Sequence, residues 1–531
     1  MKKYFFLFLT YLAVLATASA QELTWLPDVP EVKKDDEYYF GPVSEGEFVA
    51  GAGLTLMILD KKTLLPTRTL SRKELSKDKM GSDFFKTERG WACVGSSCKR
   101  MKKGEDCYLT FNELGESGFA APRNMVPYPP REEASYEVLL PYFAVRTSPN
   151  GKYVLQYSRD TFRVSDASFN EVYKKREPDF FKINGKDADR KNFKWYVDDD
   201  GNILASCVLV NGSMSESDLT RYKVVFLKYD RRKDEFLHQE AEVKDEVSPK
   251  ADGKNKAAIS RREYSLEGRG DLRTIYDIKA QNLITAGVYE DEAGSHVFSV
   301  QYDCRNNQIV PLQKHLFPSD LIEKISISSF NGKKVRGSVI FQDLLLKSNG
   351  DIMMLLELDN SNVSSGYKPL FGDDGIEIKV QNPTFDIGVM DVIYFNLGPD
   401  NNLKFYGNLP KKQVNSELEK ELLLDELSFA ATAIGNDVHV VYNTLSKAEG
   451  RELMDVKIDE NGQISRKNLL TLNKGSAVMP TRLNFGGLYD YEFITDSSIG
   501  VRTPIRVSDN AIMLRARNGK KNTLLMIDYG N

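Results

Sequence analysis

The chain repeats a short pattern in which an aromatic residue and one apolar strand lead into a Gly-containing turn and a second strand. The copies are residues 143–155 (FAVRTSPNGKYVL), 193–205 (FKWYVDDDGNILA), 341–354 (FQDLLLKSNGDIMM) and, more loosely, 429–442 (FAATAIGNDVHVVY). Asn-Gly and Asp-Gly accept the positive φ angles that a tight hairpin needs, and the flanks are rich in β-branched and aromatic residues. Each copy therefore predicts a β-hairpin.

A second pattern is an apolar strand that closes on an acidic or amide turn and is followed by another strand. The closing residues are Asp60, Asp166, Asp230, Asp303, Gly398, Asp459 and Asp528, with a weaker mark at Asn112. These marks recur roughly every 50 to 95 residues, and the first pattern usually precedes the second. One repeating unit therefore holds about four strands.

Four-stranded units repeated around a ring form a β-propeller, in which closure leaves only short, protected sheet edges. The marks predict an all-β chain with an irregular propeller of seven or eight blades. The count stays open because the N-terminal strand of a propeller often completes its last blade. The irregular spacing and the missing Trp-Asp signature argue against the WD40 subclass.

Hairpins of the type Ser148-Pro149-Asn150-Gly151 and the closing Asp residues resemble the blades of secreted bacterial propellers. The resemblance covers most of residues 38–531. It implies a β-propeller domain over that range, in an architecture whose members extend from scaffolds to hydrolases. No functional residue is carried over by it.

The aromatic residues of the first pattern are expected to have one shared role. If the two patterns are the inner and outer hairpins of blades, Phe143, Phe193, Phe341 and Phe429 occupy equivalent places in successive sheets. They should then be buried between neighbouring blades. The competing hypothesis is a ligand platform, which predicts exposed rings.

Helix signals are few. The clearest is Ser416-Glu417-Leu418-Glu419, a capping box that opens an apolar run ending at Leu427 and predicts a short helix over a loop between blades. The polar segments 71–83, 246–271 and 360–376 are expected to be long connections or small insertions.

The N-terminus has the order of a signal peptide. Met1-Lys2-Lys3 precedes an apolar run from Tyr4 to Leu15, and small residues follow up to Ala20. The run is shorter than the roughly 20 apolar residues that a membrane anchor needs. We therefore expect residues 1–20 to be removed, residues 21–37 to form an N-terminal segment, and the mature protein to be periplasmic or extracellular. Gln21 stands where a lipid-anchored protein would carry a cysteine.

Charge limits the classes of partner. The charged fraction is 28% and the formal net charge is −4, with the signs interspersed, so no basic face for nucleic acid is predicted. No later stretch is long and apolar enough to span a membrane. The expected partner is an extracellular or envelope ligand, protein or glycan, that the sequence does not identify.

The sequence contains no recognisable catalytic, metal-binding or cofactor-binding motif, so no such site is predicted. The acidic clusters at 198–201, 372–375 and 459–462 lack the EF-hand spacing, so hairpin turns explain them better than Ca²⁺ loops. The four histidines, His238, His296, His315 and His439, show no metal-ligand spacing, and a structural role is expected for each. Neither a Gly-x-Ser-x-Gly elbow nor a Ser-x-Asp-x-Gly box is present. A glycosidase-type carboxylate pair stays possible, because pairing in space cannot be read from a sequence.

The cysteines suggest one disulfide. Cys93, Cys98 and Cys107 lie close together, and Cys98 and Cys107 flank the turn near Gly104 most evenly, so they are the favoured pair. Export to an oxidising compartment permits this bond. With five cysteines in total, at least one stays free or pairs with another chain. Cys207 and Cys304 are predicted to be small buried residues.

The sequence therefore predicts an exported, non-catalytic binding or scaffolding protein of the cell envelope. The alternative is a propeller enzyme that acts on an extracellular saccharide or peptide. An enzyme should show a tight cluster of carboxylates at the central funnel, whereas a binding module should show an exposed aromatic or charged patch.

Overall fold

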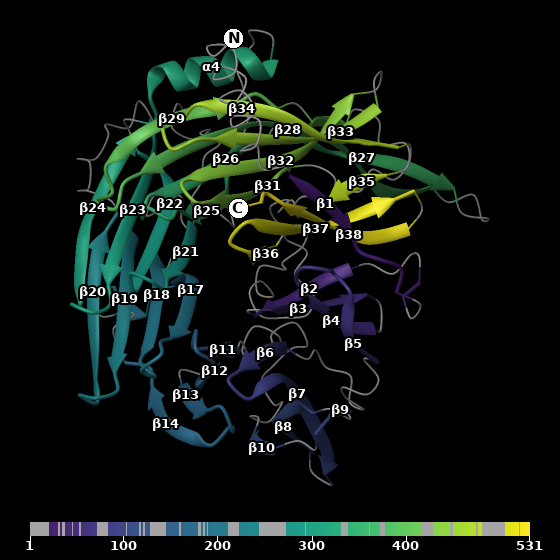
Figure 1. Ribbon diagram of the computed structural model, residues 1–531. Helices are drawn as coiled ribbons and strands as arrows, with labels where there is room; N and C mark the ends of the chain where they lie inside the picture. Colours follow the sequence, from purple (N-terminus) through teal and green to yellow (C-terminus); the bar gives the residue numbers. More distant parts are fainter. Residues whose placement is uncertain are drawn as a thin grey trace, which may run out of the picture.

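The structure is a computed structural model. It describes residues 21–29, 32–33, 38–44, 46–52, 55–71, 83–101, 104–115, 118–120, 123–127, 145–158, 161–178, 182–183, 186–187, 189–210, 222–243, 272–291, 294–330, 338–359, 362–371, 377–411, 413–415, 428–446, 450–473, 476–479, 505–519 and 521–530. Within these ranges the chain forms eight sheets of four or more strands, one two-stranded sheet and one helix. The eight large sheets are the blades of a β-propeller (Figure 1).

The first four blades follow one another along the chain, and each is an antiparallel sheet. Blade 1 is β2 (Tyr38–Val43), β3 (Glu47–Ala52), β4 (Thr55–Asp60) and β5 (Pro66–Ser71). Blade 2 is β6 (Asp83–Thr87), β7 (Gly90–Met101), β8 (Gly104–Gly115) and β10 (Arg123–Pro127), with β9 (Gly118–Phe119) beside β8. Blade 3 is β11 (Val145–Thr147), β12 (Tyr153–Ser158), β13 (Thr161–Asp166) and β14 (Glu171–Arg176). Blade 4 is β17 (Asp189–Val197), β18 (Ile203–Val210), β19 (Tyr222–Asp230) and β20 (Glu235–Glu242), and the small hairpin β15 (Lys182–Ile183) and β16 (Lys186–Asp187) precedes it.

The second half of the chain repeats this order with two elaborations. Blade 5 is β21 (Leu272–Asp277), β22 (Asn282–Asp291), β23 (Gly294–Asp303) and β24 (Gln308–Leu316), followed by helix α4 (Ser319–Phe330). Blade 6 is β25 (Ser338–Leu346), β26 (Ile352–Asp359), β28 (Glu377–Leu397) and β29 (Leu403–Leu409), and β27 (Asn362–Phe371) and β30 (Gln413–Asn415) pair with the first part of β28. Blade 7 is β31 (Ala430–Ile434), β32 (Asp437–Ser446), β33 (Gly450–Ile458) and β34 (Ile464–Leu472). Blade 8 is β35 (Ala477–Met479) and β36 (Ile505–Ser508), then β37 (Ala511–Asn518), β38 (Lys521–Asp528) and, as its outer strand, β1 (Glu22–Trp25).

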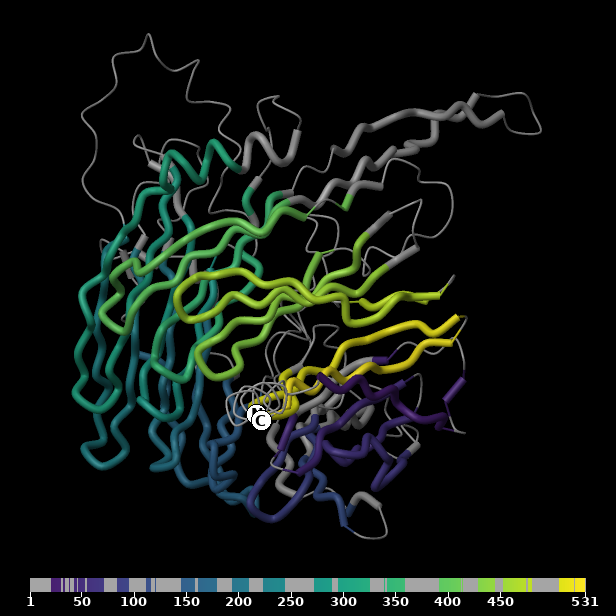
Figure 2. The backbone as a smooth tube through the Cα atoms, turned by 45° about the horizontal axis from the view of Figure 1, so that its top comes forward, coloured from purple at the N-terminus to yellow at the C-terminus, as the bar shows by residue number. Residues whose placement is uncertain are grey.

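The N-terminal strand closes the ring. β1 pairs antiparallel with β38 from Glu22 opposite Asp528 to Trp25 opposite Leu525. The amide of Leu26 then donates to the carbonyl of Leu524 at 3.0 Å. The segment 21–37 therefore contributes a strand to the propeller, and Figure 2 shows the purple N-terminal strands beside the yellow C-terminal ones.

Apolar side chains fill the interfaces between neighbouring blades. Eight buried clusters are found among the described residues, and each joins the facing sheets of two successive blades. One of them joins blade 8 to blade 1, with Met513 and Met526 packed in the same cluster as Phe48 and Met57. Because every sheet is covered on both faces by its neighbours, the ring has no separate central core.

The antiparallel strands alternate in direction, so the ring has two unlike faces. The turn between strands one and two of a blade lies on the same face as the turn between strands three and four, and we name this the turn face. The opposite face carries the remaining connections and is named the loop face. The first strands of successive blades contact one another, which places them nearest the axis. Both sequence patterns therefore mark turns on one face of the ring.

Glycine is required at the tight turns of the turn face. Gly151 has φ +71°, and a Cβ there would stand 2.5 Å from the backbone nitrogen of Glu88 in blade 2. Gly201 has φ +79°, with the ring of Tyr153 3.2 Å from the position of a Cβ. Glycine tolerates both the left-handed conformation and the close approach.

The predicted role of the aromatic residues is confirmed at two positions. Phe341 and Phe429 are buried, each in the cluster between its own blade and the preceding one. Phe193 packs in the equivalent interface between blades 3 and 4 but is only partly buried. Phe143 lies outside the described residues.

The predicted helix and the predicted connections between strands have different outcomes. The predicted helix at 416–427 lies outside the described residues, whereas α4 was not predicted. Its residues Ile325, Ser326 and Ile327 have lower helix propensity than Ala or Leu, but Leu321 is buried against blades 5 and 6 and holds the helix there. Of the two readings for 360–376, the structure supports a small insertion, because residues 362–371 form β27, which pairs with the start of β28 in an inserted hairpin. The segments 72–82 and 246–271 lie outside the described residues.

We predict that Phe341→Ala lowers the free energy of unfolding by about 3–5 kcal/mol, because the ring is fully buried and a cavity would remain. Ile464→Ala is the control, since Ile464 is exposed on β34 and its truncation should cost about 0.5 kcal/mol or less. Urea unfolding of both variants measures the difference. Equal losses would contradict the packing role of Phe341.

Candidate functional site

The acidic clusters of the turn face cap their own turns. Asp198 accepts hydrogen bonds from the backbone N–H groups of Asp200 (3.0 Å) and Asn202 (2.8 Å). Asp459 accepts from the N–H groups of Asn461 (2.9 Å) and Gln463 (2.8 Å) in the same way. The hairpin-turn prediction is confirmed for these two clusters, and the cluster at 372–375 lies outside the described residues. Within the described ranges, no group of three or more His, Cys, Asp or Glu side chains is arranged to hold a metal ion.

These capping bonds shift the acidity of the turn carboxyls. Burial acts to raise the pKa of Asp166, but the side-chain amide and backbone N–H of Asn170 stabilise the carboxylate, and the pKa of Asp166 is lowered. Asp198 is more deeply buried, and there burial outweighs the bonds from Asn202 and raises the pKa. The turn carboxylates therefore accept hydrogen bonds mainly from backbone N–H groups of their own turn, as in Asx-turns.

Turns of neighbouring blades also bond to one another near the axis. The N–H of Asn150 donates to Asp199 Oδ1 at 2.8 Å, which joins blade 3 to blade 4. The N–H of Asn349 donates to Asn436 Oδ1 at 3.1 Å, which joins blade 6 to blade 7. The turn face is thus a connected, ordered surface.

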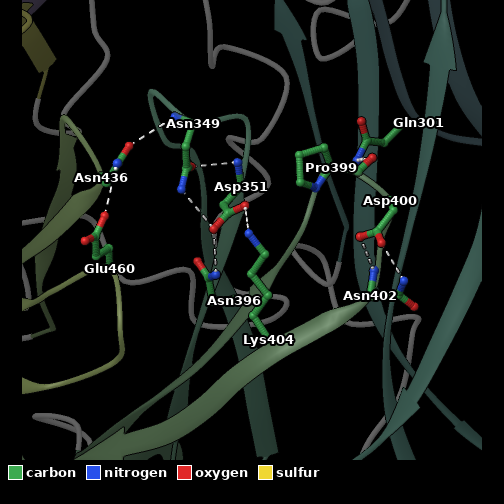
Figure 3. A network of polar contacts seen from close by, with 10 residues as sticks. All are labelled: Gln301, Asn349, Asp351, Asn396, Pro399, Asp400, Asn402, Lys404, Asn436 and Glu460. Atoms are coloured by element: carbon green, nitrogen blue, oxygen red, sulfur yellow. Dashed lines mark hydrogen bonds and ion pairs between the residues drawn. The ribbon is translucent and has the colours of Figure 1, made fainter.

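A buried carboxylate organises the turn face of blade 6 (Figure 3). Asp351 accepts from Lys404 Nζ at 2.6 Å, from Asn396 Nδ2 at 3.1 Å and from Asn349 Nδ2 at 3.2 Å. Its neighbour Lys347 is shielded from solvent, and its ammonium lies 5.1 Å from the centroid of the Phe405 ring. Burial lowers the pKa of Lys347, against the opposing effect of Asp351. This network leaves Asp351 fully engaged in structural contacts.

A second buried network joins blade 6 to blade 7. Lys411 Nζ donates to Glu357 Oε1 at 2.6 Å and to Gln413 Oε1 at 2.8 Å. Ser428 Oγ donates to the other oxygen, Glu357 Oε2, at 2.6 Å, and Gln342 Nε2 donates to it at 2.9 Å. Both side chains of the ion pair are essentially inaccessible, at 1% and 0% exposure for Lys411 and Glu357. Burial lowers the pKa of Lys411 and the nearby Glu357 carboxylate acts against that shift.

Sequence reasoning did not find this network. Glu357 and Lys411 are far apart in the chain and sit among ordinary polar neighbours, so neither forms a motif. The only local signal is that Glu357 interrupts the apolar run of β26 at residues 352–358. A charged residue inside such a run indicates a buried partner.

Two histidines have structural partners. His439 Nδ1 lies 2.9 Å from Asp455 Oδ2 and 3.1 Å from Oδ1, and its ring lies 4.1 Å from the ring of Tyr529. His315 Nε2 lies 2.8 Å from the carbonyl oxygen of Asn401. Gln21 Nε2 also donates to Asp455 Oδ2, at 2.6 Å, and so connects the start of β1 to blade 7.

Asp343 lies on β25, the inner strand of blade 6, and its carboxyl group has a raised pKa. It follows a bulge in β25, and its Oδ1 accepts the N–H of Leu344 at 2.8 Å. Burial raises the pKa of Asp343 to about 6, although the guanidinium of Arg273 on β21 acts in the opposite direction. A shifted carboxyl of this kind is a candidate functional group, and the groups that act on it among the described side chains are Arg273 and the N–H of Leu344.

The candidate binding site is an open hollow on the turn face between blades 3 and 4. It has a volume of about 370 Å³ and is lined by Tyr153, Asp199, Asp200, Arg231 and Arg232. This is near the lower end of the ~300–1,000 Å³ typical of small-ligand sites. The sequence patterns marked both turns that form it, but nothing in them singled out these five side chains.

The lining side chains are held from several directions. Arg231 Nη1 donates to the hydroxyl of Tyr153 at 2.9 Å, and the guanidinium centre lies 5.4 Å from the centroid of that ring. The backbone N–H of Arg231 donates to Asn202 Oδ1 at 3.0 Å. Arg232 Nη2 donates to Asp200 Oδ1 at 3.2 Å, in a pair whose side chains are 81% and 60% exposed. The hollow therefore offers two guanidinium groups and two carboxylates to solvent.

The backbone supports the predicted cysteine pairing. In the β7–β8 hairpin Cys98 lies directly opposite Cys107, whereas Cys93 lies opposite Asn112. The side chains of Cys98 and Cys107 lie outside the described part of the chain, so the disulfide itself stays a prediction. Cys93, Cys207 and Cys304 are buried, and burial raises the pKa of the Cys93 and Cys304 thiols to about 12.

Comparison with known proteins finds similarity of fold only. No family model matches the sequence, and no curated protein matches it. A dipeptidyl peptidase 4 from Porphyromonas gingivalis aligns at 9% identity and a TM-score of 0.37, over 93% of this chain and 59% of the other. The polysaccharide lyase Uly1 aligns at 10% and 0.35, over 85% and 90%. The β-propeller domain of the Trilobed protease from Pyrococcus furiosus aligns at 10% and 0.28, over 84% and 93%. The eight-bladed assignment rests on the strand pairing of this chain.

We predict that Lys411→Met lowers the free energy of unfolding by about 3–5 kcal/mol, because it leaves the buried carboxylate of Glu357 without its ion-pair partner. The double variant Lys411→Met with Glu357→Gln should recover part of this loss, since the uncompensated charge is then absent. Lys324→Met is the control, because the Lys324–Asp320 pair is exposed and should contribute about 0.5 kcal/mol or less. Urea unfolding measures all three. A double variant no more stable than Lys411→Met would show that the cost comes from lost packing.

We predict a pH-dependent stability term from Asp343. Because its pKa is raised from 3.8 to about 6, the native state keeps a proton between these values that the unfolded chain has released. This contribution to stability is complete below about pH 4 and is lost as the pH rises through about 6. Asp343→Asn, which retains an oxygen for the Leu344 N–H, should stabilise the protein at pH 8 relative to wild type and flatten this part of the profile. Thermal melts from pH 4 to pH 8 test it, and parallel wild-type and variant profiles would contradict it.

We predict that unfolded, unreduced protein shows three reactive thiols, because Cys98 and Cys107 are expected to be bonded to each other and Cys93, Cys207 and Cys304 are not in disulfides. Facing positions in a hairpin lie about 4.5–5.5 Å apart, within the span of a disulfide. The variant Cys98→Ser with Cys107→Ser should show three thiols with and without reductant. Five reactive thiols in the unreduced wild-type protein would refute the bond.

Proposed function

We propose that the mature protein is an exported, non-catalytic binding or scaffolding module that holds an extracellular or envelope ligand, protein or glycan, on its turn face. The observation that carries this proposal is the hollow between blades 3 and 4, where opposite charges are presented to solvent by ordered turns. A charged patch of this kind is what a binding module was expected to show.

The state of the other candidate groups supports a binding role over a catalytic one. The carboxylates of Asp351 and Glu357 are buried within hydrogen-bonded networks. Asp198 and Asp459 cap turns, and Asp455 is paired with His439. Asp198, Asp351, Glu357 and Asp455 are also buried, so a substrate in solvent does not reach these four carboxylates directly.

Export is part of the same proposal. The Lys2-Lys3 start, the apolar run and the small residues before Gln21 support removal of residues 1–20. Among the described residues no helix is long and apolar enough to cross a membrane.

The binding proposal is tested by incubating immobilised mature protein with a solubilised envelope fraction and analysing retained proteins and glycans by mass spectrometry. Arg231→Ala should lose a component that wild type retains, because its guanidinium lines the hollow. Lys233→Ala is the matched control, a cation in the same turn that does not line the hollow. The retained component should be recovered with unchanged mass after prolonged incubation.

Two results would overturn the proposal. If wild type and Arg231→Ala retain identical components, the hollow is not the site that binds the ligand. A component that is shortened or otherwise altered in mass by the wild-type protein would favour the enzyme alternative, a propeller that acts on an extracellular saccharide or peptide.

We predict that protein recovered from the envelope fraction begins at Gln21. Cleavage after Ala20 satisfies the preference for small residues at the −3 and −1 positions. Intact-mass measurement checks the start of the chain. Retention of residues 1–20 in that fraction would contradict the export proposal.

A further inference from the structure

The charges in the hollow between blades 3 and 4 are arranged in a fixed order. Asp199 and Asp200 belong to the turn between the first two strands of blade 4, β17 and β18, nearer the axis. Arg231 and Arg232 belong to the turn between its last two strands, β19 and β20, farther out. The turn that carries the two carboxylates therefore lies nearer the axis, and the turn that carries the two guanidinium groups lies nearer the periphery.

The balance of these charges limits the ligand. Two carboxylates and two guanidinium groups cancel, so the hollow as a whole attracts neither a polyanion nor a polycation. A ligand that carries a cationic group and an anionic group close together can pair with both sides at once. Guanidinium groups are well suited to the anionic partner, because they bind a carboxylate through two parallel N–H donors.

The contacts of the lining residues leave room for such pairing. Arg231 is exposed and uses one of the five guanidinium N–H donors on Tyr153. Asp199 Oδ1 accepts the N–H of Asn150, which fixes the carboxylate of this exposed residue. The Arg232–Asp200 pair is highly exposed, so it is weak and can be exchanged for contacts with a ligand.

The aromatic ring favours a peptide over a saccharide. Sugars commonly stack a ring face against an aromatic side chain, but here the guanidinium of Arg231 already covers Tyr153, at 5.4 Å from the ring centroid. Charged and hydrogen-bonding groups are then left as the means of recognition. Lys, Arg, Asp and Glu side chains of a peptide provide both signs within a few residues.

We propose that this hollow binds a peptide segment of a partner protein in which basic and acidic side chains are neighbours, with the basic group toward the axis of the ring and the acidic group toward its periphery. This inference rests on the proposed binding function and specifies its ligand class. The recognition is electrostatic, so the affinity should fall as the ionic strength rises.

The test uses the full mature protein and four probes in isothermal titration calorimetry. They are three acetylated and amidated hexapeptides, namely alternating Lys-Glu, all-Glu and all-Lys, and one neutral tetrasaccharide. The alternating peptide should bind about tenfold more tightly than either homopeptide, since only it pairs with both sides of the hollow. Arg231→Ala should weaken its binding about tenfold, whereas Lys233→Ala should change it less than about twofold.

A charge-exchanged variant tests the order of the charges. Asp200→Arg combined with Arg232→Asp keeps two carboxylates and two guanidinium groups in the hollow and should keep the melting temperature, but it leaves one charge of each sign on each turn, so the two turns no longer differ in charge. The alternating peptide should then lose about tenfold in affinity. Unchanged affinity in this variant, or equal binding of the three peptides to wild type, would overturn the inference.

The outcomes separate this inference from the broader proposal. Binding of the tetrasaccharide in an Arg231-dependent manner, without binding of the peptides, would keep the hollow as a binding site and reject the peptide class. Absence of binding by all four probes would reject the charge-pairing inference, while retention of an envelope component in an Arg231-dependent manner would still support the binding function.

Discussion

The fold depends on one constraint, which is that every blade is apolar on both of its faces and so needs a neighbour on each side. In an open stack of such sheets, the first and the last sheet would each expose one apolar face to water. Closing the stack into a ring removes both free ends at once. The closing contact is the pairing of β1 with β38, together with the cluster in which Met513 and Met526 of blade 8 pack with Phe48 of blade 1. An open stack would still bury the other seven interfaces, so the meeting of the two ends of the chain is what covers the two faces that would remain free.

Turn chemistry explains why so much of this architecture could be predicted from the sequence. The positions that need a left-handed backbone, such as Gly151 and Gly201, select glycine, and the residues before them select Asn or Asp. These requirements are local, so they leave a readable mark in every blade that has a tight turn. Blade 2 has a two-residue turn at Glu88 and Arg89 without an Asn-Gly or Asp-Gly signal, and its only mark in the sequence was weak. The number of blades could be settled only when the partner of β1 was known, because a pairing over some 500 residues leaves no local trace.

The polar networks could not be predicted for the opposite reason, since their partners are distant along the chain. Glu357 and Lys411 meet only because the connection after β29 returns toward blade 7; the apolar run around Glu357 indicates a buried partner, but Lys411 looks like a surface residue in the sequence. The hollow is a similar case. Tyr153 belongs to blade 3, while Arg231 belongs to the last turn of blade 4, and the packing of the two blades alone brings them together. Local patterns could locate the two turns but could not show which of their side chains share a surface.

The arrangement of turns also explains why a charged surface can be specific here. An exposed pair such as Arg232 and Asp200 has little intrinsic energy, because water and salt screen it and both side chains move freely. Its backbone, however, is held by the capping bonds of Asp198 and by the contact of Asn150 with Asp199. The backbone positions from which these side chains extend are therefore fixed, and under the proposed binding function less conformational entropy would be lost when a ligand binds. Capped turns thus limit the region in which each mobile charged group can lie, which is how an exposed charged surface could discriminate between ligands under that proposal.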